Sequence, residues 1–270
     1  MTQGLLETTP AQVRAGAQPI ENSLSTYLLH GFSQISGFVN PLARDITFTL
    51  GDIQRDTMAP GPTLEIGVGQ GQYLCLLSHL PAVPTMTVAV DPALDGPADA
   101  PHIAAFERNI DLFVRRPDLL RLCARASRLL TPRQLLALAG EPFQFISLNG
   151  SRMLDDAAHD LRLAQATVAD RGIVVVDNVP HPAAPGVWEA FVRYGKDPGA
   201  TLAPFLICGN KLFMAQKTHA AHYHSTLLEW CRTQRAGAVG FEIDAFRQQL
   251  IGIAQEARLF GYDILVHRKL

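Results

Sequence analysis

A glycine-rich turn between an apolar run and a helical pattern is the feature that most constrains this chain of 270 residues. The apolar run Thr63–Ile66 leads into Gly67, Gly69 and Gly71, and residues 72–80 then have the spacing of a helix. Glycine lets the backbone turn sharply and approach a ligand closely. A strand that passes through such a turn directly into a helix is typical of doubly wound α/β folds, in which the turn borders a ligand crevice.

Strand and helix patterns alternate through the middle of the chain. Expected strands lie at residues 63–66, 85–90, 119–124, 143–148, 173–176, 204–208 and 211–216, and expected helices at residues 72–80, 103–115, 132–139, 154–169 and 186–194. Such alternation predicts a parallel sheet with helices on both faces. Arg171 and Gly172 are expected to mark the end of the helix before the fifth strand. Only Gly209 and Asn210 separate the last two strands, which favours a hairpin and therefore one antiparallel strand.

Segments without a recognisable motif flank this alternating region. Helical patterns are expected at residues 23–29, 45–58, 221–233 and 243–257, and a last apolar run at residues 262–266. The chain is therefore expected to divide into a helical N-terminal extension (1–58), an α/β domain (59–217) and a helical C-terminal extension (218–270) packed on the same domain. Extensions of this kind often build lids or dimers, so a homodimer is one expectation.

Composition and charge narrow the class of partner. Hydrophobic residues make up 47% of the chain and charged residues 18%, which suits a large core, and the formal net charge is −2. Without a basic excess the chain has no electrostatic footprint for nucleic-acid phosphates. No apolar run approaches the roughly 18 residues that a spanning helix needs, and the N-terminus lacks a signal-peptide pattern. We therefore expect a cytoplasmic protein with a small-molecule partner, and neither a nucleic acid nor a membrane.

Four cysteines, Cys75, Cys123, Cys208 and Cys231, lie far apart and match no zinc-binding spacing. Each lies in an apolar stretch, which favours a buried free thiol. Free thiols agree with a reducing, cytoplasmic setting.

The spacing of the glycines and two nearby acids indicate which ligand the turn would hold. The dinucleotide-binding pattern G-x-G-x-x-G needs a glycine where this chain has Gln72, and no G-K-[ST] sequence follows. Glu65 lies at the end of the buried strand and suits a cationic group better than a pyrophosphate. Asp91 ends the next strand, where it can accept hydrogen bonds from ribose hydroxyls. A tight strand–helix turn with no ligand is the alternative.

Residues 65–71, together with Asp91, resemble motifs one and two of the class I S-adenosylmethionine-dependent methyltransferases. The resemblance spans residues 64–217 and implies a Rossmann-like, doubly wound α/β fold with seven strands in the order 3-2-1-4-5-7-6, the seventh antiparallel. It implies that S-adenosylmethionine is the cofactor, that Glu65 serves its methionine end and that Asp91 holds the ribose. The cofactor-binding residues so implied are Glu65, Gly67, Gly69, Gly71, Asp91, Ser127 and Asn149, with Ser127 matching a turn near the adenine.

Polar residues also follow two further apolar strands: Asn149 follows residues 143–148, and Asp177 and Asn178 follow residues 173–176. This half resembles the cation-dependent O-methyltransferases of the catechol type and relatives that act on sugar hydroxyls of natural products. The resemblance implies that Asn149, Asp177 and Asn178 hold Mg²⁺ or a similar hard cation, which lowers the pKa of an acceptor hydroxyl. Asn149 stands where the family has an aspartate, so one negative charge is missing and metal assistance stays open.

A histidine offers a second route to deprotonate the acceptor. His181 follows Asn178 by three residues in the loop expected to cover the acceptor, and histidine is the usual general base near neutral pH. Asp177, Asn178 and His181 are therefore the candidate catalytic residues. The leading hypothesis is methyl transfer from S-adenosylmethionine to a hydroxyl of a small molecule. The alternatives are an S-adenosylmethionine-binding module with a degenerate acceptor site that acts through a partner and, ranked last, an NAD-dependent oxidoreductase.

Overall fold

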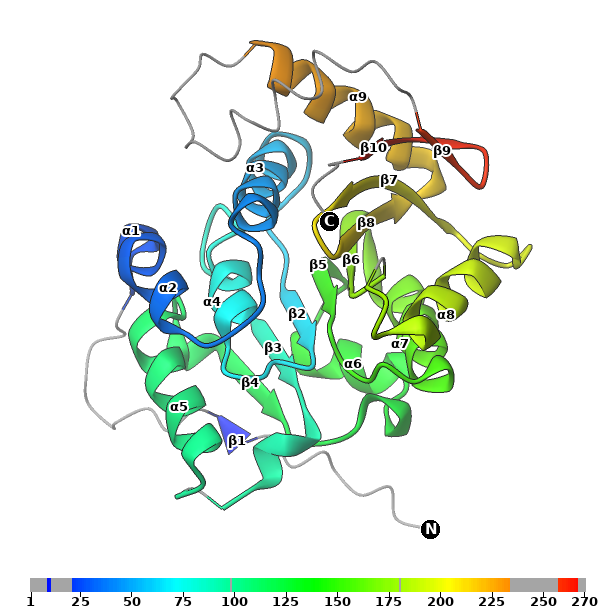
Figure 1. Ribbon diagram of the computed structural model, residues 1–270. Helices are drawn as coiled ribbons and strands as arrows, with labels where there is room; N and C mark the ends of the chain where they lie inside the picture. The colour runs from blue at the N-terminus through cyan, green and yellow to red at the C-terminus, as the bar shows by residue number, and fades with distance from the viewer. Residues whose placement is uncertain (1–8, 11–20, 98, 180, 234–256, 267–270) are drawn as a thin grey trace.

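A central β-sheet with helices on both faces organises the molecule (Figure 1). The computed structural model describes residues 9–10, 21–97, 99–179, 181–233 and 257–266. The strands are β1 (Thr9–Pro10), β2 (Thr63–Ile66), β3 (Thr87–Val90), β4 (Leu120–Cys123), β5 (Phe143–Leu148), β6 (Val168–Asp177), β7 (Leu202–Cys208), β8 (Lys211–Gln216), β9 (Ala257–Leu259) and β10 (Tyr262–Val266). Across the sheet they follow the order β1-β4-β3-β2-β5-β6-β8-β7-β10-β9.

The strands from β2 to β8 confirm the expected topology. Counted from β2 as the first strand, their spatial order is 3-2-1-4-5-7-6, and the last of them, β8, is antiparallel to both of its neighbours. The expected width of seven strands is wrong, because the sheet continues at both edges. At one edge β1 pairs antiparallel with β4, and at the other β10 pairs parallel with β7. The C-terminal extension was expected to be helical. The structure shows that it also adds two strands, β10 and β9, to the sheet.

The helices pack in two groups, one on each face of the sheet. They are α1 (Leu24–Thr26), α2 (Phe32–Gln34), α3 (Pro41–Thr57), α4 (Gln72–Ser78), α5 (Pro101–Phe113), α6 (Pro132–Ala139), α7 (Leu154–Thr167), α8 (Pro185–Lys196) and α9 (Lys217–Thr233), with a π-helical turn at Tyr27–Gly31. Apolar residues of α3, α4, α5 and α9 share one hydrophobic cluster, and those of α6, α7 and α8 share the other. No helix in these described ranges is long and apolar enough to cross a membrane.

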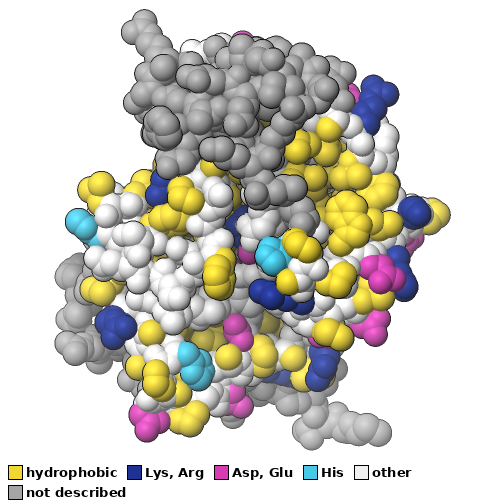
Figure 2. Space-filling model, viewed as in Figure 1, with side chains coloured by type: hydrophobic (Ala, Val, Ile, Leu, Met, Phe, Trp, Pro, Cys, Tyr) yellow, Lys and Arg dark blue, Asp and Glu magenta, His cyan; other side chains and the backbone are white. Residues whose placement is uncertain are grey.

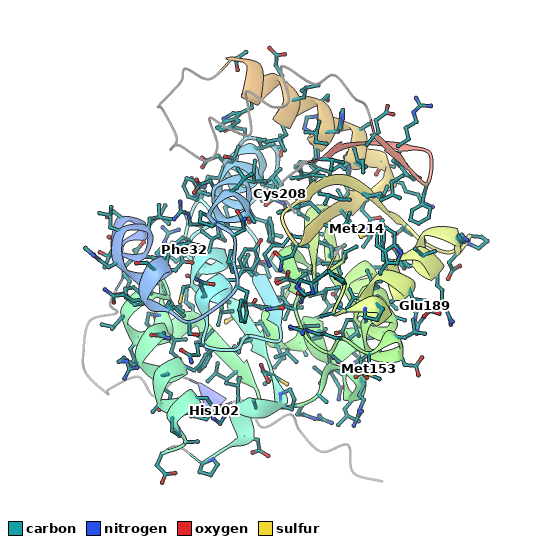
Figure 3. The ribbon with its side chains drawn as sticks, viewed as in Figure 1. Phe32, His102, Met153, Glu189, Cys208 and Met214 are labelled. Atoms are coloured by element: carbon teal, nitrogen blue, oxygen red, sulfur yellow. The ribbon has the colours of Figure 1, made fainter. Side chains whose placement is uncertain are left out.

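The central strands are buried on both faces, as their apolar sequences predicted. In β6, Ile173 and Val175 face one hydrophobic cluster, whereas Val174 and Val176 face the other. This alternation follows from the two-residue period of a strand. Residues of the interior and of the surface can be compared in Figure 3: Cys208 and Met214 of the hairpin strands are fully buried, whereas His102 and Glu189 are exposed. On the face shown in Figure 2, acidic and basic side chains are interspersed.

Local signals set the bounds of several helices. Helix α3 begins four residues earlier than expected, because the Asn40 side chain accepts a hydrogen bond from the Leu42 backbone N–H at 2.8 Å and Pro41 suits the first helical position. Helix α6 begins with a capping box between Thr131 and Gln134. The expected helix at 243–257 falls almost wholly outside the described residues.

The boundary between α7 and β6 differs from the prediction. Helix α7 ends at Thr167 and β6 begins at Val168, so Arg171 and Gly172 lie within the strand rather than marking the end of the helix. Val168 pairs with Phe143, and the register shifts between Phe143 and the next pair. This irregularity accommodates the extra residues at the start of β6, and no local sequence signal announces it.

The free thiols agree with the prediction as far as the structure describes them. Cys75, Cys123 and Cys208 are buried and unpaired. The side chain of Cys231 lies outside the described part of the chain.

Candidate functional site

Four parallel strands bring the candidate residues to one edge of the sheet. Strands β3, β2, β5 and β6 lie side by side, and their last apolar residues are register partners. The residues that follow these partners therefore gather at the same edge, which is the ligand-binding edge of doubly wound folds. They are Gly67, Asp91, Asn149 and Asp177.

The glycine turn adopts a backbone that other residues rarely take. Gly67, Gly69 and Gly71 have φ angles of 82°, 51° and 88°, all in the left-handed region. A Cβ on Gly67 would lie 2.2 Å from the carbonyl oxygen of Asn149, so only glycine fits at that position. A Cβ on Gly69 would meet nothing within 4 Å. The turn therefore presents bare backbone to open space at Gly69.

Asp91 holds the glycine turn in place. Its Oδ2 accepts hydrogen bonds from the backbone N–H groups of Val68 at 3.0 Å and Gly69 at 3.4 Å. Its Oδ1 accepts from the backbone N–H of Ala93 at 2.9 Å. A carboxylate offers about four acceptor positions, so Asp91 keeps one for a further donor.

Glu65 is a buried acid with an unsatisfied oxygen. The residue is 1% exposed, and its Oε2 has no hydrogen-bond partner. Burial raises the pKa of the Glu65 carboxyl well above its usual range; Lys211 counteracts this rise, whereas Asp177 and Asp91 add to it. An unpaired buried carboxyl costs folding free energy that a donor or a cation would recover. Glu65 is therefore poised to interact with a ligand that carries such a group.

Gln72 anchors the N-terminal segment over the turn. Its Nε2 donates to the carbonyl oxygen of Phe32 at 2.8 Å, and its Oε1 accepts from the backbone N–H of Val39 at 3.1 Å. The hydroxyl of Tyr27 donates to the Gln72 carbonyl oxygen at 2.6 Å. A glycine at position 72, as in the dinucleotide pattern, would remove both of these side-chain hydrogen bonds to the segment. Gln72, which departs from that pattern, therefore holds the N-terminal segment against the start of α4.

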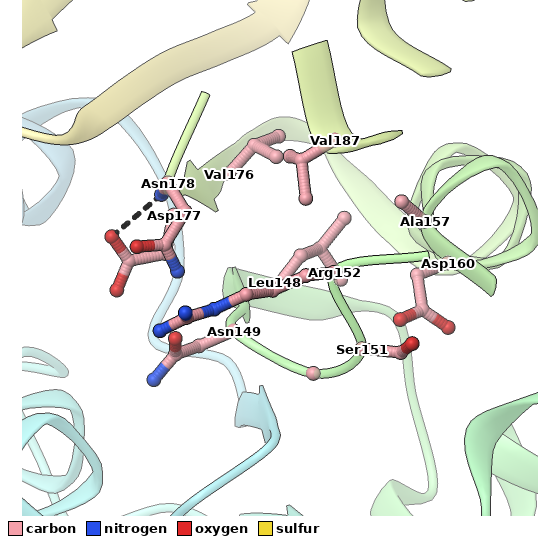
Figure 4. A pocket seen from close by; sticks show the side chains of 11 residues that line it. Leu148, Asn149, Ser151, Arg152, Ala157, Asp160, Val176, Asp177, Asn178 and Val187 are labelled. Atoms are coloured by element: carbon pink, nitrogen blue, oxygen red, sulfur yellow. Dashed lines mark hydrogen bonds between the residues drawn. The ribbon is translucent and has the colours of Figure 1, made fainter. Parts of the chain in front are cut away.

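A hollow beside the turn is lined by polar residues from the segment that follows β5, from the end of β6 and the residue after it, and from α7 (Figure 4). Its polar lining consists of Asn149, Ser151, Arg152, Asp160, Asp177 and Asn178. In the close-up, the guanidinium of Arg152 extends toward Asn149. Asn178 has a φ of 61°, a left-handed conformation that asparagine tolerates better than most residues. The hollow brings together Asn149, Asp177 and Asn178, three of the four residues that the sequence singled out for the acceptor side; its lining does not include the fourth, His181.

Asp177 makes an ion pair with a fully buried lysine. The Nζ atom of Lys211 lies 2.8 Å from Asp177 Oδ2, and Lys211 is 0% exposed. The two residues are register partners on β6 and β8. The other carboxylate oxygen, Oδ1, accepts from the Asn178 backbone N–H at 2.8 Å and from Asn210 Nδ2 at 2.5 Å. Three donors therefore share the Asp177 carboxylate.

The donor set does not suit a hard divalent cation. Such a cation prefers several negatively charged oxygen ligands. Asn149 and Asn178 supply neutral amides, and the charge of Asp177 is balanced by Lys211. Nowhere in the described ranges do three His, Cys, Asp or Glu side chains cluster in a way that could hold a metal.

Comparison with known proteins identifies the fold. No family model matches the chain, and no curated protein matches its sequence. Among solved structures, an O-methyltransferase from Bacillus cereus in complex with S-adenosylhomocysteine superimposes with a TM-score of 0.51 at 16% identity, covering 70% of this chain and 87% of that one. The chain has the class I methyltransferase fold. Likeness at this level of identity shows the fold alone.

Two further solved structures share this methyltransferase fold. The cofactor-bound Rv0187 from MTB has a TM-score of 0.51 and 17% identity, with 74% of this chain and 98% of that chain covered. CalS11, a TDP-rhamnose 3'-O-methyltransferase of calicheamicin biosynthesis, has a TM-score of 0.50 and 15% identity, with 72% and 86% covered.

Two residues expected to act at the candidate site lie outside the strands that form it. His181 is exposed, and its Nδ1 accepts from the backbone N–H of Ala183 at 3.1 Å, which assigns the proton of the neutral ring to Nε2. Ser127 begins a 3₁₀ turn (Ser127–Leu129), and its carbonyl oxygen faces a ring nitrogen of His159 at 3.1 Å. The roles of His181 and Ser127 stay predictions.

Sequence reasoning missed two charged residues of this site, Lys211 and Asp160. Asp160 is 3% exposed, lies on the buried face of α7 and has no partner for its Oδ1. Burial raises the pKa of Asp160 to about 6, against the influence of Ser127 and His159. A signal existed for both residues: each is a charge at an otherwise apolar position, Asp160 on a helix stripe and Lys211 at the start of a buried strand. Charges at such positions are rarely fully buried unless paired.

Proposed function

We propose that this protein binds S-adenosylmethionine and transfers its methyl group to a hydroxyl oxygen of a small molecule. The glycine turn carries the proposal, because it opens onto free space at Gly69, Asp91 binds its backbone, and the strand that leads into it ends with the buried, unsatisfied Glu65. When bound, this cofactor supplies an electrophilic methyl group on a sulfonium; the protein supplies binding and orientation.

The two acids divide the work of holding the cofactor. Asp91 keeps an acceptor position that suits a ribose hydroxyl, while its other bonds hold the turn. The unsatisfied Glu65 oxygen suits the cationic methionine end, because a nearby cation favours the ionised carboxyl. Ser127 and Asn149 complete the proposed set on the adenine side and at the end of β5.

The polar hollow is the proposed acceptor site. Asn149 and Asn178 offer amide groups that can orient a hydroxyl, and Asp177 lines the same hollow. His181 is the proposed base. Because its Nδ1 accepts from a backbone N–H, the ring has to turn before it offers a free basic nitrogen to the acceptor.

One observation favours the alternative of a cofactor-binding module without transfer. The Asp177 carboxylate is already shared by Lys211, Asn210 and Asn178, and the Lys211 ammonium balances its negative charge. Asp177 therefore keeps one acceptor position, as Asp91 does, but no uncompensated charge with which to activate an acceptor. Binding of the cofactor is common to both functions, so only turnover separates them.

Calorimetric titration with S-adenosylmethionine and, separately, with NAD tests the cofactor assignment. We expect binding of S-adenosylmethionine and its demethylated product, and no binding of NAD; the reverse result would overturn the proposal. Transfer of a radiolabelled methyl group to a panel of catechols and sugar nucleotides then tests the activity. Binding without transfer to any member, in the presence and absence of Mg²⁺, would favour the binding module.

A further inference from the structure

A buried lysine is paired with a residue that lines the proposed acceptor site, Asp177. Lys211 is 0% exposed and is the first residue of β8, the second strand of the hairpin. Burial of an ammonium is costly unless the charge is paired and hydrogen-bonded. A fold that keeps one here needs a compensating arrangement around it.

The surroundings of Lys211 provide that compensation. Its Nζ donates to Asp177 Oδ2 at 2.8 Å and lies 4.3 Å from the centre of the Tyr73 ring. The Tyr73 hydroxyl is in turn 2.7 Å from that of Thr47, which fixes the ring. The attraction between an ammonium and an aromatic face strengthens when both are removed from water. The ammonium therefore occupies a built site rather than an incidental position.

The balance of charge in this region differs from that of a site for a divalent cation. Asp177 is the one carboxylate among the three residues expected to hold a metal, and Lys211 neutralises it. The hollow is also lined by the cationic side chain of Arg152. Asp160 of α7 lines the same hollow, but the Asp177 carboxylate is already bound by three donors. A divalent cation placed beside Asp177 would therefore be repelled by the adjacent Lys211 ammonium and would have to compete for a carboxylate that is already shared.

We propose that the Lys211 ammonium takes the electrostatic place of a divalent cation beside Asp177, so that the acceptor site is closed to metal ions and works without one. This inference rests on the proposed methyl-transfer function, because the hollow is an acceptor site only if that function holds. Lys211 is a positioning residue: it does not line the hollow but acts through Asp177, which does.

The test uses Mn²⁺ as a probe of the full chain. Binding is measured by electron paramagnetic resonance of free Mn²⁺, and the effect of Mn²⁺ on the melting temperature is recorded in parallel. The variants are Lys211→Met, Asp177→Asn and the double variant that carries both changes. Lys217→Met is the matched control, because Lys217 is exposed and its loss changes the net charge equally.

We expect the unaltered protein to bind Mn²⁺ no better than Asp177→Asn does. Lys211→Met should bind Mn²⁺ about tenfold or more tightly than the unaltered protein and melt at a higher temperature in its presence. The double variant and Lys217→Met should lose or lack that gain. These results together would support the inference that the Lys211 ammonium takes the place of a metal ion beside Asp177.

Two results would overturn the inference. One is Mn²⁺ binding by the unaltered protein that disappears in Asp177→Asn, which would mean that the metal site exists despite Lys211. The other is a folded Lys211→Met variant with no gain in Mn²⁺ affinity. If Lys211→Met does not fold, the first comparison still decides. Mn²⁺ binding needs neither S-adenosylmethionine nor turnover, so failure here is separate from failure of the methyltransferase proposal.

Discussion

Asp91 Oδ2 accepts a hydrogen bond from the backbone N–H of Val68 at 3.0 Å, which joins the ends of two neighbouring strands. The acid after β3 thereby shapes the glycine turn after β2 before any ligand arrives. A turn held in this way is pre-organised, so less ordering is required when a cofactor binds. Because the turn is already held in place, a substitution in it tests the contact with the cofactor rather than the folding of the turn.

Replacing Gly69 with aspartate should abolish cofactor binding and leave the fold intact. The φ of Gly69 is 51°, which aspartate tolerates better than most residues, and the new side chain would project into the open space that the cofactor needs. We expect the affinity for S-adenosylmethionine, measured by calorimetry, to fall by about 100-fold or more, equivalent to about 3 kcal/mol.

Gly140→Asp is the matched control for that change. Gly140 also has a left-handed φ, of 85°, and a Cβ there meets nothing within 4 Å, but it caps the end of α6 away from the turn. It carries the same added charge and a similar backbone cost. Equal affinities in Gly69→Asp, Gly140→Asp and the unaltered protein would show that the cofactor does not lie against Gly69.

Replacing Gln72 with glycine completes the dinucleotide pattern G-x-G-x-x-G without, we expect, creating NAD binding. The change removes both side-chain hydrogen bonds to the N-terminal segment, at Phe32 and Val39. Each lost bond that leaves a buried partner unsatisfied costs about 1 kcal/mol or more, so the free energy of unfolding should fall by about 2 kcal/mol. Urea denaturation measures the loss of stability, and an NAD titration tests whether the completed pattern binds NAD. Measurable NAD binding would favour the oxidoreductase hypothesis.

Replacing Asp177 with asparagine should destabilise the protein by about 3 kcal/mol or more, because it leaves the buried Lys211 charge unpaired. Affinity for S-adenosylmethionine should persist, whereas methyl transfer should be lost. The double variant Asp177→Asn/Lys211→Met removes both charges and should recover part of the lost stability. Denaturation of all three variants gives the coupling between the two residues.

The ion pair between Asp170 and His219 supplies the comparison, since Asp170 lies at the surface with a side chain 79% exposed. Asp170→Asn should change the free energy of unfolding by less than about 1 kcal/mol. An Asp177→Asn variant as stable as Asp170→Asn would contradict the buried-charge argument.

Asp160 should make stability depend on pH. Its carboxyl has a pKa of about 6 in the folded protein, against an ordinary value of 3.8, because it is buried. The folded state therefore binds the proton more tightly, so stability falls as the pH rises between these values and stays lower above them. Asp160→Asn should remove this loss and gain up to about 3 kcal/mol over the unaltered protein on going from about pH 4 to about pH 8.

Urea denaturation of the two proteins at both pH values measures the difference. The exposed Asp155 in the first turn of the same helix offers a control, Asp155→Asn, for loss of a negative charge near the start of α7. A stability difference between Asp160→Asn and the unaltered protein that is the same at both pH values would contradict the raised pKa.

The sequence by itself determined where most strands and helices of the α/β region lie along the chain, because apolar runs, glycines and helix signals are local, whereas the order of the strands across the sheet was implied by the family resemblance. Thr63–Ile66 and Phe143–Leu148 are strands with the expected bounds, and Pro132–Ala139 is a helix with the expected bounds. The rule that parallel strands end at one edge then placed their terminal polar residues together. That is why Asp91, Asn149 and Asp177 could be named as neighbours before the fold was known.

Only the tertiary structure decided which charges meet. Lys211 and Asp177 are 34 residues apart in the chain, and they pair because β8 lies antiparallel to β6 in one register. A shift by one residue would turn Lys211 to the other face of the sheet, and strands that are apolar on both faces, as β7 and β8 are, do not exclude that shift by their sequence alone. The resemblance to a cation site followed from residue types, whereas the balance of charge in the site depends on a partner that only the register supplies.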